Sequence, residues 1–213
     1  MIKLLLFTAG VAFSAGADTT QNTLIGFVQA MALFPGVVTK AHEELDRIVG
    51  DGRLPTIDDI KSLPYMRGIV KETLRWLPTT ISAALPHAAT ADDTIDGYDI
   101  PAGAGIVLAV WTVHNDPEIF PDPRTFEPNR HNLDLTVGEA VQASEVRNCI
   151  WTFGAGRRMC PGLHLAENTF SLAIARMLWA FNLSKAKDEN GNEIAIDPTA
   201  LTQSVAVCPL PFR

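Results

Sequence analysis

The chain has 213 residues, of which 47% are hydrophobic, and a formal net charge of -7 at pH 7. This length supports a hydrophobic core, in one domain or as part of a larger one. The acidic balance argues against non-specific nucleic-acid binding. The three cysteines, Cys149, Cys160 and Cys208, include no C-x-x-C pair. They therefore do not indicate a disulfide framework, and we expect a reducing compartment.

The N-terminal region has two interpretations. A mostly apolar run extends from Leu4 to Ala17, and Ala15-Gly16-Ala17 has the form of a secretory cleavage site. The run is too short for a comfortable transmembrane span. Apolar residues continue beyond it, and no proline interrupts the chain before Pro35. We therefore expect one continuous buried helix that ends near residue 34, and the alternative is a small secreted protein that begins at Asp18.

Two helices are predicted next. An amphipathic helix covers residues 37–49, and Gly50 ends it. A second helix covers residues 65–76, because Pro64 suits the first helical turn and Pro78 excludes a continuation.

Turn-rich sequence after residue 78 predicts short strands, which cover residues 84–87, 94–95, 98–100 and 105–110. Asp96-Gly97 is the strongest hairpin signal. One helical turn is expected at 111–115, followed by an irregular meander over 120–132. We interpret residues 133–146 as a surface insertion.

A long helix is predicted over residues 163–181. Asn190-Gly191 then indicates a final hairpin, with edge pieces at 194–196 and 205–208. Together these elements predict a mainly α fold with small β-sheets, an α+β class, in a single domain over residues 1–213.

The stretch from Phe153 to Gly162 combines chemistry that suits a metal-bound thiolate. Cys160 lies between a glycine-rich turn and an apolar helix, where the helix dipole and unpaired N–H groups favour the thiolate over the thiol. Pro161 suits the first helical position, and Gly162 allows a flat cofactor to approach. Arg158 has the geometry to bind a carboxylate in a bidentate manner. The alternative is a buried free cysteine beside solvated arginines.

This stretch resembles the haem-binding loop of the cytochrome P450 monooxygenases, in which the cysteine is the axial ligand of the iron. The resemblance implies haem as the cofactor and Cys160 as the metal ligand. It also places five other residues of the stretch around the haem: Phe153, Gly154, Gly156, Arg158 and Gly162.

Glu72 and Arg75 are spaced i, i+3 on the helix over 65–76. Alone, such a pair is an ordinary surface ion pair worth about 0.2–0.5 kcal/mol. The resemblance implies a buried triad completed by Arg130, from the segment Phe126-Glu127-Pro128-Asn129-Arg130. We interpret this triad as a folding element and not as a catalytic one.

The segment from Ala15 to Thr20 predicts a local helix distortion. Glycine lowers helix stability, and a threonine hydroxyl tends to bond to a carbonyl one turn earlier. The resemblance implies an oxygen-binding groove, in which Asp18 and Thr19 relay protons to dioxygen. Gly16 and Ala17 would leave room for dioxygen and substrate. The alternatives are a helix cap at Asp18 and a signal-cleavage junction.

The histidines divide into one candidate and three others. The resemblance places His87 near a haem propionate, with an exposed turn histidine as the alternative. His42, His114 and His131 are expected to be surface or packing residues.

The motifs occur in the family's order over nearly the whole chain, and they are most similar to fungal and other eukaryotic microsomal members. Family members are roughly twice as long. The resemblance therefore implies the C-terminal half of the cytochrome P450 fold as a single partial domain over 1–213. Full-length relatives are expected at the cytosolic face of the endoplasmic reticulum membrane, with the anchor absent here.

The resemblance implies a function for the chain. It would insert one oxygen atom from O2 into a small apolar organic substrate, with NADPH-derived electrons supplied by a flavoprotein reductase. The alternative is a non-catalytic remnant with weak or no haem binding. This interpretation requires that the Cys160 sulfur does not face bulk water and that a flat space lies between it and Gly16. We expect half a pocket to leave much of the haem exposed to water.

Overall fold

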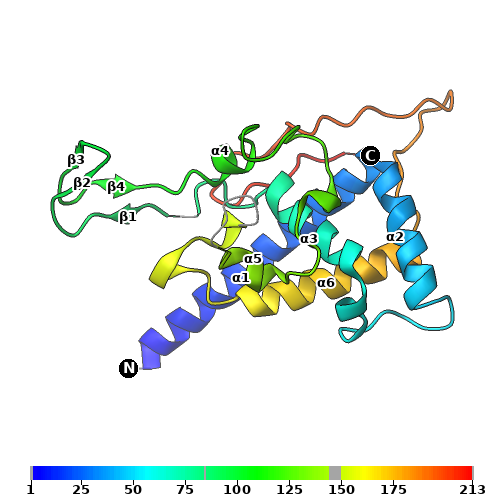
Figure 1. Cartoon of the computed structure of the whole chain (residues 1–213), viewed down its shortest axis with the longest axis horizontal. Coiled ribbons are helices and arrows are strands. Elements are labelled where there is room, and N and C mark those ends of the chain that lie inside the picture. The colour runs from blue at the N-terminus through cyan, green and yellow to red at the C-terminus, as the bar shows by residue number, and fades with distance from the viewer. Residues whose placement is uncertain (1, 84, 144–149, 213) are drawn as a thin grey trace.

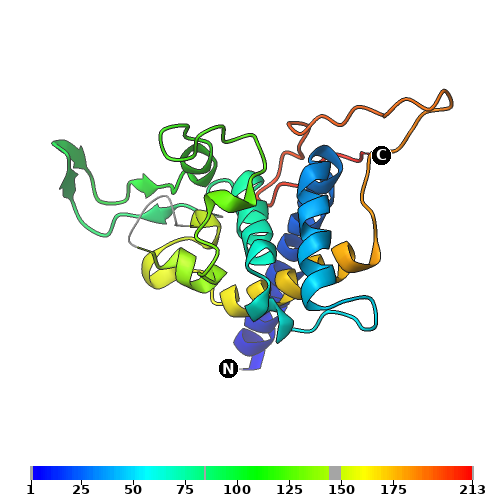
Figure 2. The ribbon, with the colours of Figure 1, turned by 45° about the vertical axis from the view of Figure 1, so that its right-hand side comes forward.

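Four helices form the body of the molecule in the computed structural model, which describes residues 2–83, 85–143 and 150–212. They are α1 (Ile2–Leu33), α2 (Pro35–Ile48), α3 (Pro64–Trp76) and α6 (Leu163–Ala180). Every pair among these four helices is in contact. Figure 1 shows α1 and α6 running through the body, and Figure 2 shows α2 and α3 side by side. The helical bounds agree with the sequence prediction to within about two residues at each end of α2, α3 and α6.

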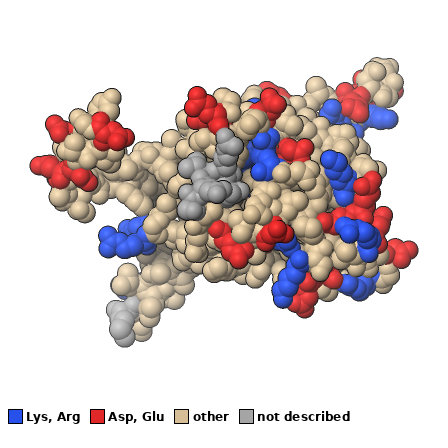
Figure 3. Space-filling view, in the orientation of Figure 1, with Lys and Arg blue, Asp and Glu red and all other residues tan. Residues whose placement is uncertain are grey.

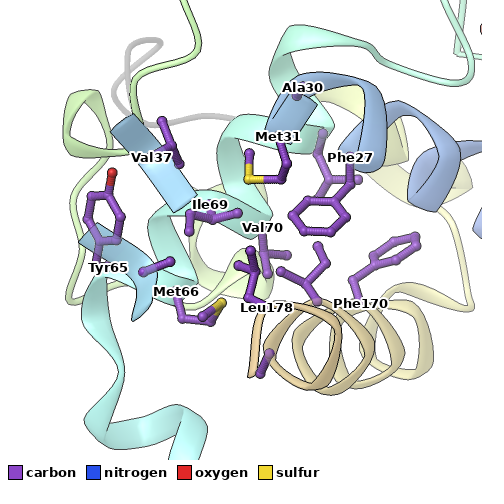
Figure 4. Packing of buried hydrophobic residues seen from close by; sticks show 14 of the residues in the cluster. Phe27, Ala30, Met31, Val37, Tyr65, Met66, Ile69, Val70, Phe170 and Leu178 are labelled. Carbon is purple, nitrogen blue, oxygen red and sulfur yellow. The ribbon is translucent and has the colours of Figure 1, made fainter. Parts of the chain in front are cut away.

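The core lies where these helices meet. Phe27 and Met31 of α1 face Val70 of α3, and Phe170 of α6 closes the cluster (Figure 4). All four side chains are buried. Because each comes from the apolar face of a helix, hydrophobic burial is the main term that holds the four helices together.

The helix α1 is continuous, as predicted, but only its second half is buried. Buried side chains begin at Thr23, whereas residues 2–18 are exposed, including Phe7 and Phe13. The expectation of a buried helix is therefore wrong for its first half, which projects from the body (Figure 1). By length and composition α1 is apolar enough to cross a membrane, a test that core helices and signal sequences also pass.

Helix ends follow the local chemistry of proline and glycine. Pro35 and Pro64 occupy the first turns of α2 and α3, where a missing N–H has no consequence. Gly50 has a φ of 73° and donates its N–H to the Leu45 carbonyl at 3.1 Å. A glycine in the left-handed region is a common helix terminator, so the predicted end of α2 has the expected cause.

The strands form an arm of two separate two-stranded antiparallel sheets. The strands are β1 (His87–Ala88), β2 (Asp93–Ile95), β3 (Tyr98–Ile100) and β4 (Gly105–Ile106), paired β1–β4 and β2–β3. Asp96 and Gly97 both have positive φ and make the predicted two-residue turn. Acidic side chains gather at the outer end of this arm (Figure 3).

Two expected strands differ from those found. The strand expected over 84–87 starts only at His87, with residue 84 outside the described residues. The strand expected over 105–110 ends at Ile106, because Val110 already begins the short helix α4 (Val110–His114).

The prediction of a surface insertion over 133–146 is wrong where the structure describes it. A short helix, α5 (Val137–Val141), buries Val137 and Ala140 and packs against α3 and α6. Thr136 and Glu139 form a reciprocal capping box at its start. Residues 144–146 lie outside the described part.

The chain after α6 is extended and irregular. Gly191, with a φ of 84°, makes the predicted turn between Lys187 and Glu193, which form an isolated bridge. The edge pieces expected at 194–196 and 205–208 are not strands. The Val207 N–H donates to the Thr79 carbonyl at 2.7 Å, which ties this segment to the body.

Candidate functional site

The cysteine loop, residues 151–162, begins with a short 3-10 turn, η4 (Trp151–Phe153), and continues into η5 (Gly156–Arg158). Gly154 and Gly156 have φ values of 76° and 64°, a region that favours glycine. The Cys160 N–H then donates to the Phe153 carbonyl at 2.9 Å. The glycines therefore allow the loop to fold back, and the hydrogen bond fixes Cys160 beside η4.

The predicted start of the long helix at residue 163 is confirmed, but the helical position expected for Pro161 is wrong. The helix α6 begins at Leu163 with Gly162 as its N-cap, so Pro161 lies outside the helix. Cys160 is a free, exposed cysteine. A Cβ added at Gly162 would lie 3.7 Å from the Cys160 Sγ, which is ordinary van der Waals contact. The thiol thus sits on an open face just ahead of α6, so the expectation that its sulfur is shielded from water is wrong for this chain.

The side chains predicted to bind the haem carboxylates, Arg158 and His87, are exposed and do not contact each other through a hydrogen bond. Neither side chain forms a hydrogen bond or ion pair with any residue that the structure describes. Phe153 is half-buried and packs against the core. His87 is exposed at the start of β1 and not in a turn, and its place near a haem propionate stays a prediction.

On α1 the segment from Ala15 to Thr20, the expected oxygen-groove segment, remains helical throughout. The Thr19 hydroxyl donates to the Ala15 carbonyl at 2.6 Å, as the sequence predicts for a threonine in a helix. Asp18 is exposed and Thr19 half-buried. The predicted distortion produces no break in the helix at Gly16.

A groove of about 900 Å³ contains Gly16 and Ala17. It lies between α1, Met177 of α6 and the C-terminal segment 208–212. Cys160 does not line it. This groove is therefore not the flat space that the sequence interpretation requires between Cys160 and Gly16.

The residues of the cysteine loop fit a haem on its thiolate side, and the groove beside Gly16 does not supply the other side. Cys160 supplies a free thiol, and Gly162 leaves the space above it clear of side-chain atoms from that position. Among the described residues no group of three or more His, Cys, Asp or Glu side chains could hold a metal ion. A single thiolate is the donor set of a haem iron held by cysteine, and not of a zinc site.

The Glu72 cluster, defined as Glu72, Arg75, Arg130 and His131, precedes the cysteine loop in the sequence and is almost fully buried. The Arg75 Nε donates to the Glu72 Oε2 at 2.7 Å, and the Arg130 Nε donates to the Glu72 Oε1 at 3.1 Å. The Glu72 and Arg75 side chains are 0% exposed and that of Arg130 11%. The structure thus brings the three predicted triad members together.

His131 is a fourth member that the sequence analysis placed at the surface or in packing. Its Nε2 lies 2.8 Å from the Glu72 Oε2, and its side chain is 1% exposed. Because a carboxylate only accepts, the proton is on Nε2. The only sequence signal was its position next to Arg130.

The two arginines also bind backbone carbonyls of the meander. Arg75 donates to the carbonyls of His114 and Pro123, both at 2.7 Å. Arg130 donates to those of Pro121 and Thr125. The charges of the cluster therefore hold irregular backbone in place, which explains how the meander is ordered without regular structure.

Burial and hydrogen bonds act in opposite directions on the acid of the cluster. Burial alone would raise the pKa of Glu72, but hydrogen bonds from Arg75 and His131 outweigh it and lower that pKa from 4.5 to about 2. Burial lowers the pKa of His131, opposed by the hydrogen bond to Glu72. Glu72 is thus ionised and His131 neutral at pH 7.

Comparison with known proteins gives a consistent result. A family model described as Cytochrome P450 matches residues 3–207. The cytochrome P450 monooxygenase yanC of Aspergillus niger is 42% identical over 212 residues, which are 97% of this chain and 39% of that protein. The monooxygenase fogE of Aspergillus ruber is 46% identical over 186 residues, 87% of this chain and 34% of that protein.

A solved structure agrees with these relatives. A zebrafish cytochrome P450 with abiraterone matches with a TM-score of 0.78 and 27% sequence identity, over 96% of this chain and 44% of that one. The chain thus spans about 39% of the length of the Aspergillus niger relative.

Proposed function

This chain belongs to the cytochrome P450 family of haem monooxygenases, and we propose that it is the haem-thiolate part of an enzyme that inserts one oxygen atom from O2 into a small apolar organic substrate. The observation that carries the proposal is the cysteine loop, in which Cys160 has a free thiol and its backbone N–H donates to the Phe153 carbonyl. The other oxygen atom leaves as water, so each turnover requires two electrons and two protons.

The residues of the loop would hold the haem as follows. Cys160 would donate its thiolate to the iron, and Gly162 would leave the approach to the sulfur open. Arg158 and His87 would bind the carboxylates of the haem edge, because both side chains are exposed and unengaged by the residues described. When bound, a haem with a thiolate ligand supplies the activation of dioxygen.

On α1, Asp18 and Thr19 would deliver protons. The Thr19 hydroxyl already donates to the Ala15 carbonyl, so its oxygen can still accept a hydrogen bond from a proton donor. Asp18 is exposed, which lets it exchange protons with water. Gly16 keeps the helix surface beside them clear, since a Cβ added there meets no atom within 4 Å.

The electron donor would be an NADPH-dependent flavoprotein reductase that docks near the cysteine face. Arg157 and Arg158 are both exposed on η5 and present positive charge there. We place the longer protein at the cytosolic face of the endoplasmic reticulum membrane, as the resemblance implies.

A second candidate is a non-catalytic remnant with weak haem binding. The exposed Cys160 favours it, because water at the iron stabilises ionised groups and admits side reactions. The two candidates share a fold and differ in whether the thiolate binds iron.

Reconstitution with haem separates them. The reduced carbon monoxide complex of a thiolate-bound haem has a strongly red-shifted Soret band, which Cys160→Ser should abolish. Cys208→Ser is the matched control, since Cys208 is a second free thiol outside the loop. Absence of the band from the unmodified chain would favour the remnant. A band that persists in Cys160→Ser would overturn the assignment of Cys160.

A further inference from the structure

His114, at the end of α4, connects the Glu72 cluster to the cysteine loop. Its backbone carbonyl accepts a hydrogen bond from the Arg75 Nη1 at 2.7 Å. Its ring Nε2 accepts the backbone N–H of Trp151 at 3.1 Å. The side chain is fully buried. One residue thus contacts the buried ion pair with its backbone and the first residue of η4 with its ring.

The loop that begins at Trp151 leads directly to the candidate iron ligand. Phe153, at the end of η4, accepts the N–H of Cys160. Thr152, between them, donates its hydroxyl to the Leu74 carbonyl of α3 at 2.8 Å. Two helices therefore hold η4. The His114 ring of α4 accepts its Trp151 N–H, and the Leu74 carbonyl of α3 accepts its Thr152 hydroxyl.

We propose that His114 is a positioning residue, whose neutral ring fixes the start of the cysteine loop relative to Arg75 and thereby sets where Cys160 is presented. The step from loop to haem rests on the proposed function; the step from ring to loop does not. His114 makes no contact with substrate or haem in this proposal and acts only through Trp151.

The protonation state of His114 supports this role. An Nε2 that accepts a hydrogen bond belongs to a neutral ring with its proton on Nδ1. Burial and then the positive charge of Arg75 lower the pKa of His114 to about 3, against the opposing charge of Glu72. The Phe120 ring packs edge-on against the imidazole. The acceptor therefore persists at all pH values at which the chain is expected to work.

Amide hydrogen exchange on the full chain tests the first step. His114→Leu removes the acceptor, and His114→Gln restores one near the position of Nε2. We expect exchange at Trp151, Gly154 and Cys160 to become about fivefold faster in His114→Leu. In His114→Gln the rates should return to within about twofold of the original.

Val38→Ala is the control, because Val38 is buried in α2 and its loss destabilises the core without touching the loop. Equal exchange in His114→Leu and Val38→Ala would show general destabilisation and overturn the proposal. Failure of His114→Gln to restore slow exchange would show that volume, and not the acceptor, matters, and would also overturn it.

A spectroscopic measurement tests the second step. In the haem-reconstituted chain we expect His114→Leu to lose about half or more of the red-shifted band, and His114→Gln to keep it. An unchanged band in His114→Leu would overturn the second step. If the unmodified chain shows no band, the proposed function fails, while the exchange result still decides whether His114 positions the loop.

Discussion

The Glu72 cluster and the cysteine loop are adjacent regions with opposite surroundings. In the cluster, four charged or ionisable side chains are almost fully buried from solvent, and each contacts another member. In the loop, Arg158 and Cys160 are exposed, and the Arg158 side chain has no partner among the described residues. Among the described residues, the start of the loop is therefore supported from within the chain, whereas its cysteine face is open.

The difference follows from where each set of partners lies in the sequence. The cluster draws on α3 and on the meander, and both lie within this chain. No described residue covers the first half of α1 or the cysteine face. If the support is independent of the site, substitutions in the Glu72 cluster should change stability, and substitutions beside Cys160 should change haem binding.

Glu72→Gln should give the largest effect. The substitution leaves Arg75 and Arg130 without their counter-ion in a buried site, at a cost of about 3–5 kcal/mol. Urea unfolding followed by tryptophan fluorescence measures it. Glu118→Gln, at an exposed carboxylate in the same stretch of chain, should leave the midpoint unchanged. A similar midpoint for both variants would mean that the cluster is not a folding element.

Acid should lower the free energy of unfolding in two pH windows. The pKa of His114 is about 3 in the folded chain, below its ordinary value of 6.5, so only the unfolded chain binds a proton as pH falls below 6.5. Stability from this group is therefore lost between pH 6.5 and 3, by about 2–3 kcal/mol at pH 4.5. Glu72, with a pKa of about 2, adds a loss as pH falls from 4.5 toward 2.

His114→Gln sharpens that measurement. It removes the titrating ring but keeps a polar group, so the slope of unfolding free energy against pH between 6.5 and 4.5 should flatten. His131 titrates in the same direction and leaves a residual slope. An unchanged slope would assign the acid sensitivity to other groups.

In the loop, the two glycines beside Cys160 should behave differently. Gly156 has a φ of 64°, so Gly156→Ala is strained and should cost about 1–2 kcal/mol. Gly162 has a φ of -87°, and its new methyl would meet the Cys160 Sγ at an ordinary 3.7 Å. We expect Gly162→Ala to unfold at the original midpoint but to bind haem more weakly in a titration. Equal losses of stability would contradict the assigned backbone roles.

Sequence patterns identified elements whose causes are local. Proline and glycine fixed the ends of α2 and α3, and Asp96-Gly97 fixed one hairpin. The missed helix α5 was also local, since its Thr136–Glu139 capping box is readable in the sequence. The apolar pattern of α1 predicted a helix but carried no information on which half is covered.

The candidate site was predictable where a motif existed. Glu72 and Arg130 were paired by motif across 58 residues. His114 ends the five-residue helix α4 and His131 lies in irregular backbone, both too short of periodicity to mark a buried side, and their partners are 37 and 59 residues away. Only the folded chain shows that these histidines contact Trp151 and Glu72.

The smallest effect is expected on α1, where two threonines one turn apart differ in burial and in their hydrogen-bond partners. Thr19 is half-buried and bonds within its own helix, so Thr19→Val should change the unfolding free energy by less than about 0.5 kcal/mol. Thr23 is buried, and its hydroxyl lies 2.7 Å from that of Thr79. Thr23→Val strands the Thr79 hydroxyl and should cost about 1–3 kcal/mol in the same urea titration. A large loss in Thr19→Val would mean that the oxygen-groove segment already supports the fold, and that its threonine is not reserved for proton delivery.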